Sequence, residues 1–226
     1  MLVLGLDTCC ETCSVAIAND KNLLIQTSTN KHKKRSSEII IKQIKNILNF
    51  SNIKVSEIDF FATTVGPGSF TGTRIGISII KALSQSLEKK CIPISTLECL
   101  ANNITWENFL ICPTIDAKND YVYSCFFKRK NKTLVKLEEE NIISLSALTK
   151  KINNYENKII FISDEALIYE KLTNLKISNA IMAPFLINSG LASSVVQLSL
   201  DKITNNKTIN YNEILPLYIK NCYYEN

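Results

Sequence analysis

The chain has 226 residues, of which 46% are hydrophobic, and a formal net charge of +5. This length can bury one large core or two small ones. No apolar run approaches the ~20 residues of a membrane span, and the first residues lack the basic start and long apolar stretch of a signal peptide. These features predict a cytoplasmic protein without membrane contact.

The first half begins with short apolar or alternating segments joined by polar turns, which predicts a meander of three strands. A helix follows, and its main apolar stripe carries Ile40, Ile44, Ile47 and Leu48. The predicted order of elements in this half is βββαβαβα. The strands are expected at 2–7, 13–19, 22–28, 59–65 and 91–95. The helices are expected at 36–51, at 70–88 and from Ser95 to about Ile104.

The second half repeats this order. A strand at 109–117 carries Asp116 near its end, as the strand at 2–7 ends in Asp7. Returning strands are predicted at 121–129 and 132–143, followed by helix 146–153, strand 158–163 and helices 164–174 and 193–205. We therefore predict an α/β protein with two related βββαβα-type halves, the second reduced, with a boundary between residues 1–105 and 106–226.

Four of the six glycines fall between residues 66 and 76. Gly66, Pro67 and Gly68 end a predicted strand and indicate a sharp turn, and Ser69 or Thr71 can cap the next helix. A strand, glycine loop and helix in this order could bind an anion. The spacing matches neither a dinucleotide fingerprint nor a P-loop.

The remaining two glycines of this cluster, Gly72 and Gly76, lie one helical turn apart. They fall within the apolar stripe of helix 70–88, although a glycine inside a helix costs about 1 kcal/mol. Missing side chains in an apolar stripe allow another backbone to approach closely. That backbone could belong to the chain's own sheet or to a helix of another subunit. The first helix carries a second apolar ridge, Ile39 and Phe50, which favours a second buried contact.

The sequence predicts no catalytic residue and no metal site. His32 is the single histidine, so a site with two histidine ligands is impossible and a Ser–His–Asp triad would depend on this residue. Asp7 and Asp116 are weak candidates for a metal or nucleotide contact. Two basic runs, Lys31–Arg35 and Lys128–Lys132, fit either a solvated surface or a contact with nucleic acid.

Cysteines are frequent but follow no disulfide framework. The segment CETC has Cys-x-x-Cys spacing, yet no second ligand pair is spaced for zinc and no helix start is expected there to activate a thiol. We predict small buried hydrophobes of a reducing compartment at Cys9, Cys10, Cys13, Cys91, Cys99, Cys112, Cys125 and Cys222.

Three stretches, LVLGLDTCCETCSVAI, VGPGSFTGTRIGISIIKALS and LECLA, together resemble the TsaB (YeaZ) family of bacterial tRNA threonylcarbamoyladenosine biosynthesis. The second stretch is the most specific, and the resemblance covers about the first half closely and the second half loosely. It implies the actin-like ATPase (ribonuclease H-like) fold. This fits the duplicated strand–turn–strand units.

The resemblance implies a non-catalytic subunit that supports the transferase TsaD, together with the ATPase TsaE, on tRNAs reading codons that start with A. ATP and metal would then belong to the partner subunits, and the chain alone would form a homodimer. The interface would lie on the two helices of the first half and include Ile40, Ile44, Ile47, Gly72, Arg74, Ile75, Gly76, Ile79, Ile80 and Leu83. A glycoprotease-type peptidase and a free-standing ATPase are the alternatives.

Overall fold

The computed structural model describes residues 1–30, 36–163, 165–175, 177–184 and 191–219. Contacts between the described residues divide the chain into two compact units. The first unit comprises Met1–Cys99 and the described part of Ser189–Leu217. The second comprises the described part of Leu100–Asn188 and Tyr218–Asn226. The predicted boundary at residue 105 differs from this division because the chain returns to the first unit near its end.

The first unit is built on a five-stranded sheet in the order β3-β2-β1-β4-β5. The three N-terminal strands are antiparallel, whereas β1, β4 and β5 run parallel. The strands are β1 (Leu2–Asp7), β2 (Thr12–Asn19), β3 (Leu23–Asn30), β4 (Phe60–Thr64) and β5 (Lys90–Ile94). The predicted meander is confirmed, and the strands predicted at 59–65 and 91–95 correspond to β4 and β5.

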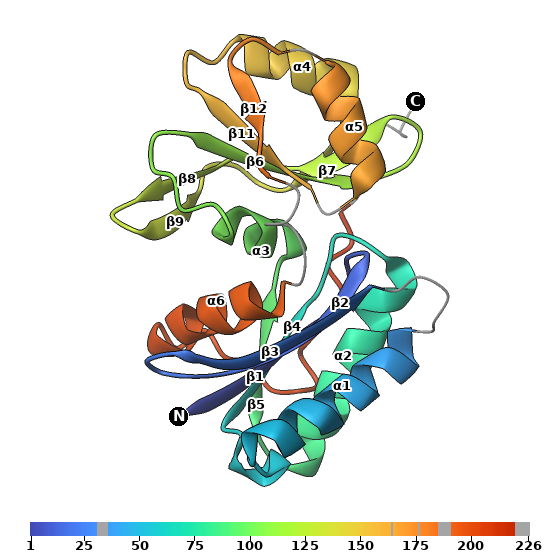
Figure 1. The fold of residues 1–226 in the computed structure, drawn as a ribbon, viewed down its shortest axis with the longest axis vertical. Helices are drawn as coiled ribbons and strands as arrows, with labels where there is room; N and C mark the ends of the chain where they lie inside the picture. The colour runs from blue at the N-terminus through green and yellow to red at the C-terminus, as the bar shows by residue number, and fades with distance from the viewer. Residues whose placement is uncertain (31–35, 164, 176, 185–190, 220–226) are drawn as a thin grey trace. The chain divides into compact units, whose positions relative to one another are not determined.

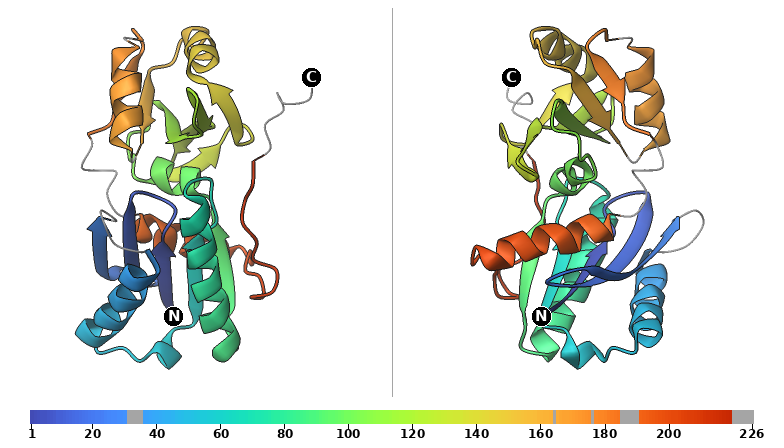
Figure 2. Two further views of the ribbon diagram at one scale, coloured as in Figure 1. Left: turned by 90° about the vertical axis from the view of Figure 1, so that its right-hand side faces the viewer. Right: turned by 60° about the vertical axis from the view of Figure 1, so that its left-hand side comes forward.

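Helices cover both faces of this sheet. Helix α1 (Ser36–Ser51) and α2 (Phe70–Ser86) lie on one face, and α6 (Ala192–Thr204) lies on the other (Figures 1 and 2). The 3₁₀ turn η1 (Val55–Glu57) precedes β4, and α3 (Thr96–Asn102) follows β5. None of the helices in the described ranges is long and apolar enough to cross a bilayer.

Helix α6 joins the first unit for clear steric and polar reasons. Gly5 leaves room on β1 for the side chains of Val195 and Val196, which would lie 2.9 and 2.7 Å from a Cβ at that position. The Oγ of Ser14 accepts the N–H of Ala192 at 3.0 Å. This hydrogen bond occupies a donor of the first helical turn, where backbone N–H groups lack intrahelical partners.

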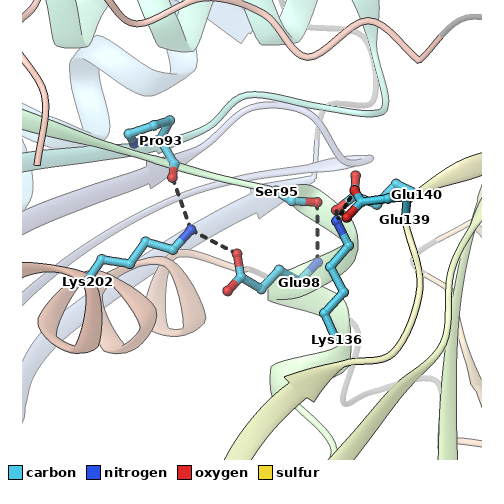
Figure 3. Close-up of polar contacts among 7 residues, drawn as sticks. All are labelled: Pro93, Ser95, Glu98, Lys136, Glu139, Glu140 and Lys202. Carbon is cyan, nitrogen blue, oxygen red and sulfur yellow. Dashed lines mark hydrogen bonds and ion pairs between the residues drawn. The ribbon is translucent and has the colours of Figure 1, made fainter. Parts of the chain in front are cut away.

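The far end of α6 is held by an ion pair. Lys202 Nζ lies 3.0 Å from the carboxylate of Glu98 and donates to the carbonyl of Pro93 at 3.3 Å (Figure 3). The N–H of Glu98 also points to the Oγ of Ser95, at 3.5 Å. Both ends of α6 are therefore anchored to the sheet and its following turn.

The second unit repeats the path of the first. Its strands follow the order β10-β7-β6-β11-β12, again antiparallel on one side of the first strand and parallel on the other. The elements are β6 (Leu110–Asp116), β7 (Tyr121–Ser124), β10 (Asn141–Ser144), β11 (Ile159–Ile162), β12 (Ala180–Met182), α4 (Leu145–Asn153) and α5 (Ala166–Asn174). The predicted duplicated α/β architecture is confirmed.

Two predicted strands are wrong. The segment 132–143 was predicted as one strand, but it divides into β9 (Thr133–Lys136) and β10. The segment 121–129 was expected to form one strand, but it breaks into β7 and β8 (Phe127–Lys130), and β8 forms a hairpin with β9. Cys125 and Phe126 are both buried, so the strand alternation fails between the two pieces. The ring of Phe126 packs against Tyr155, with centroids 5.1 Å apart. Burial of two successive side chains therefore divides the strand.

Candidate functional site

The glycine loop after β4 packs against the turn between β1 and β2. Gly66 and Gly68 have φ angles of +108° and +147°, a region that favours glycine. A Cβ at Gly68 would lie 2.8 Å from the carbonyl oxygen of Cys9. That same oxygen accepts the N–H of Ser69 at 2.9 Å. The loop is thus fastened to the turn by its own backbone.

Gly72 and Gly76 extend this contact into α2. A Cβ at Gly72 would lie 1.9 Å from the carbonyl oxygen of Thr8, and a Cβ at Gly76 would lie 2.5 Å from the Thr8 hydroxyl. The Thr8 hydroxyl donates to the carbonyl of Gly72 at 2.7 Å. Both glycines are buried. The closely approaching backbone is therefore that of the chain's own β1–β2 turn, which resolves the choice that periodicity left open.

Several polar groups of the loop at residues 66–71, a candidate anion site, form hydrogen bonds within the fold. The Oγ of Ser69 caps α2 by accepting the N–H of Gly72 at 3.1 Å. The carbonyl of Gly66 accepts the N–H of Thr96 at 2.9 Å. Pro67 is buried and Thr71 is exposed. These contacts give the loop a packing role.

The two candidate carboxylates occupy equivalent strand ends in their own units. Asp7 is fully buried, and its Oδ1 accepts the Thr64 hydroxyl at 2.7 Å and the N–H of Cys9 at 3.0 Å. Asp116 forms an ion pair with Lys118 two residues away. Among the described residues, no group of three or more His, Cys, Asp and Glu side chains could hold a metal ion. His32 and the run Lys31–Arg35 lie outside the described residues.

The seven cysteines that the structure describes are all buried, as predicted, and no two of them form a disulfide. Cys222 lies outside the described residues. Burial, with the nearby charge of Asp7, raises the pKa of the Cys9 thiol to about 11. The pKa of Cys91 is also raised by burial to about 11. Thiolate, the reactive form, is therefore scarce at these positions near neutral pH.

Alkylation tests this directly. At pH 8, a thiol with a pKa of about 11 is thiolate in only roughly one molecule in a thousand. We expect Cys9 to stay unmodified by iodoacetamide in the native protein and to react fully in urea, as mapped by peptide mass spectrometry. Rapid native labelling at Cys9 or Cys13 would instead indicate an accessible, activated thiol.

The outward side of α1 and α2 carries an apolar groove. Its volume is about 460 Å³, and it is lined by Ser37, Ile41, Phe70, Thr71, Arg74, Ile75, Ser78 and Ile79. Ile41 is 55% exposed and Phe70 is 59% exposed. The guanidinium carbon of Arg74 lies 3.8 Å from the centroid of the Phe70 ring, within the range of a cation–π contact. The groove therefore combines exposed hydrocarbon with one positioned cation.

The predicted interface residues divide between the two sides of these helices. Three line the outward groove: Arg74, Ile75 and Ile79. Leu83 is half-buried and packs against the core of the first unit. Six belong to the chain's own core, because α1 and α2 use that side to cover the sheet: Ile40, Ile44, Ile47, Gly72, Gly76 and Ile80. The inward six are buried in the core of the first unit, and their role at an interface stays a prediction.

Sequence reasoning missed Ile41 and Phe70. The run Ile39–Ile41 contained the signal, because three successive isoleucines in a helix span about 200° and cannot all face one sheet. The structure buries the first two and exposes the third. The second ridge predicted on α1 also divides, since Ile39 is buried whereas Phe50 is 82% exposed.

Comparison with known proteins gives concordant matches. A family model described as TsaD, tRNA N6-adenosine threonylcarbamoyltransferase, matches residues 24–217. The tRNA threonylcarbamoyladenosine biosynthesis protein TsaB of Buchnera aphidicola subsp. Acyrthosiphon pisum (strain APS) is 30% identical over 210 residues, which cover 90% of each chain. TsaB of Escherichia coli (strain K12) is 33% identical over 147 residues, 63% of this chain and 62% of that protein.

A solved structure agrees over nearly the whole chain. The crystal structure of a Pseudomonas aeruginosa protein, described as similar to the peptidase YeaZ, superposes with a TM-score of 0.83 at 18% identity and covers 97% of this chain and 99% of that one. At this identity the likeness shows the fold. The duplicated sheets and their covering helices define a protein of the actin-like ATPase fold. Within that class, the chain belongs to the TsaB (YeaZ) family of tRNA threonylcarbamoyladenosine biosynthesis proteins.

Proposed function

We propose that this chain is a non-catalytic subunit of the assembly that forms threonylcarbamoyladenosine beside the anticodon of tRNAs reading codons that start with A. It binds a TsaD-type transferase through the groove between α1 and α2, and the ATPase TsaE joins the assembly. In the absence of TsaD, the same face pairs two copies of the chain. ATP and metal are held by the partner subunits.

The outward apolar groove is the observation that carries this proposal. Exposed apolar groups concentrated on one face mark interaction sites more often than scattered ones do. Ile41 and Phe70 are more than half exposed, and they share the groove with Ile75 and Ile79. Two adjacent helices with an apolar outer side can pack against two more helices as a bundle. TsaD is a suitable partner since its family model also matches this chain.

The polar contacts of the two strand-end aspartates support a non-catalytic role. Asp7 is engaged by Thr64 and by the turn that follows β1, and Asp116 is engaged by Lys118. An ATPase or peptidase would need groups that remain available to substrate or metal. The Oδ1 of Asp7 instead links the β1–β2 turn to β4, and the carboxylate of Asp116 pairs within its own turn.

A charge placed in the groove tests the proposal. We expect Ile41→Asp to weaken binding of TsaD by at least about 30-fold, because loss of a central apolar contact costs about 2 kcal/mol or more and the new carboxylate would be desolvated. Calorimetric titration of purified TsaD measures the affinity. Modification of tRNA by the reconstituted assembly should fall in parallel.

Ile181→Asp is the matched control, since Ile181 is 45% exposed and lies on β12 of the second unit. It introduces the same charge in place of the same side chain, so TsaD affinity should stay within about twofold of wild type. Wild-type affinity in a folded Ile41→Asp protein would refute the proposed groove.

A further inference from the structure

The β8–β9 hairpin presents a row of exposed lysines. Lys128 and Lys130 alternate with the buried Arg129 along β8, so both lie on its exposed face, and Lys132 follows in the turn. None of these three lysines forms an ion pair with any residue in the described ranges. By contrast, the Nζ of Lys136 on β9 lies 3.1 Å from the carboxylate of Glu139 (Figure 3).

An exposed aromatic side chain lies on the segment that is hydrogen-bonded to the hairpin turn. Trp106, the single tryptophan of the chain, is 43% exposed and packs on Phe109 with ring centroids 5.6 Å apart. The next residue, Glu107, accepts the backbone N–H of Lys132 at 3.0 Å. This hydrogen bond ties the loop that carries the indole to the turn that carries the lysine.

A buried arginine on the inner face of β8 forms hydrogen bonds that hold the hairpin. Arg129 Nε donates to the carbonyl of Ile104 at 2.8 Å, one of its terminal nitrogens donates to the carbonyl of Asn102 at 3.0 Å, and the other donates to the carbonyl of Lys132. The guanidinium thus connects the turn to the chain segment just before Trp106. These hydrogen bonds connect the backbone of the hairpin turn to the segment that carries Trp106, both within the second unit.

We propose that the outer face of the β8–β9 hairpin, together with Trp106, is a contact surface for unpaired nucleotides of tRNA. Lysine ammonium groups neutralise phosphates, and an exposed aromatic ring provides a platform on which any base can stack. This inference rests on the proposed function only in naming tRNA as the RNA. An acidic protein segment would satisfy the lysines but would leave the indole without a stacking partner.

The surface carries a net positive charge. Glu107 accepts the N–H of Lys132, and its negative charge raises the pKa of Arg129 against the larger lowering effect of burial. The carboxylates that follow β9 are paired with Lys136 and Lys151. No carboxylate among the described residues forms an ion pair with the three exposed lysines of the hairpin, so they can contact an external anion. Val135, the cross-strand partner of Lys128, is 40% exposed, so the same face adds an apolar contact beside the charges.

Tryptophan fluorescence tests the surface in the full-length chain. Because Trp106 is the only tryptophan, its emission reports on this location alone. Titration with an unmodified tRNA transcript at low salt should give a saturable quench. Removing two phosphate contacts with Lys128→Gln/Lys130→Gln should lower the slope of log K against log salt by about 1.4, the value for single-stranded contacts. The control Lys150→Gln/Lys207→Gln removes two exposed lysines elsewhere and should leave the slope unchanged.

The assembled complex with TsaD supplies the second readout. Trp106→Ala should weaken binding of labelled tRNA by about 5- to 100-fold, the range for losing one base stack, while TsaD affinity remains that of wild type. Unchanged tRNA affinity in both the lysine and the tryptophan variants would overturn the inference. So would loss of TsaD affinity in those variants, or a quench by polyglutamate equal to that by tRNA. Failure of Ile41→Asp to affect TsaD binding would refute the proposed function separately.

Discussion

Replacing Gly72 with alanine is expected to lower the free energy of unfolding by about 3 kcal/mol or more, at the upper end of overpacking penalties. The new methyl carbon would lie 1.9 Å from the carbonyl oxygen of Thr8, a backbone atom that cannot rotate away. Helix propensity alone would predict the opposite, a gain of about 1 kcal/mol. Urea unfolding followed by circular dichroism measures the difference.

Ala82 provides the control within the same helix, because it is exposed. Ala82→Gly should cost about 1 kcal/mol through propensity alone. If Gly72→Ala were neutral or stabilising, the contact between α2 and the β1–β2 turn would have to be looser than the structure shows.

This contact also changes how variants of Gly76 should be interpreted. A Cβ there would lie 2.5 Å from the Thr8 hydroxyl and 2.8 Å from the Thr63 hydroxyl. A bulky side chain such as leucine would therefore disrupt the first unit itself. Loss of partner binding in such a variant would reflect unfolding, so the exposed Ile41 is the informative position.

Replacing Arg129 with methionine is expected to cost about 3 kcal/mol in the second unit. Methionine has a similar reach but donates no hydrogen bond, so the carbonyls of Asn102, Ile104 and Lys132 lose their guanidinium donors. Each buried carbonyl left unpaired costs about 1–3 kcal/mol. The gain from no longer burying a charge offsets part of this cost, and burial indeed lowers the pKa of Arg129.

Hydrogen exchange read by mass spectrometry localises the effect. Peptides that cover the β8–β9 hairpin should lose protection in Arg129→Met, whereas peptides of β1 and β4 should not change. Lys130→Met on the opposite face of β8 is the control and should stay within about 0.5 kcal/mol of wild type. Full protection of the hairpin in Arg129→Met would show that its strand pairing suffices without the guanidinium.

Together these contacts assign different roles to the two sides of α1 and α2. The inward side fits the sheet and the β1–β2 turn through Ile40, Ile80 and the two helical glycines. The outward side presents Ile41 and Phe70 in the groove. A substitution therefore tests stability or partner binding according to which side it occupies.

Local patterns in the sequence were sufficient to predict the architecture of this protein. Hydrophobic periodicity located α1 and α2 closely, and the strand–aspartate–turn–strand units at Asp7 and Asp116 revealed the duplication. The glycine cluster marked a close backbone approach, and its motif identified the family. These features are local, because each depends on residues within one or two elements.

The contacts of those features depend on packing between segments that lie far apart in the chain. An apolar stripe shows that a helix buries one side, but it does not say whether the neighbour is the chain's own sheet or another subunit. Gly72 meets Thr8, 64 residues away, and α6 returns to β1 across most of the chain. The division of segment 121–129 and the placement of Arg129 behind the hairpin likewise depend on packing between distant segments, which sequence spacing does not encode.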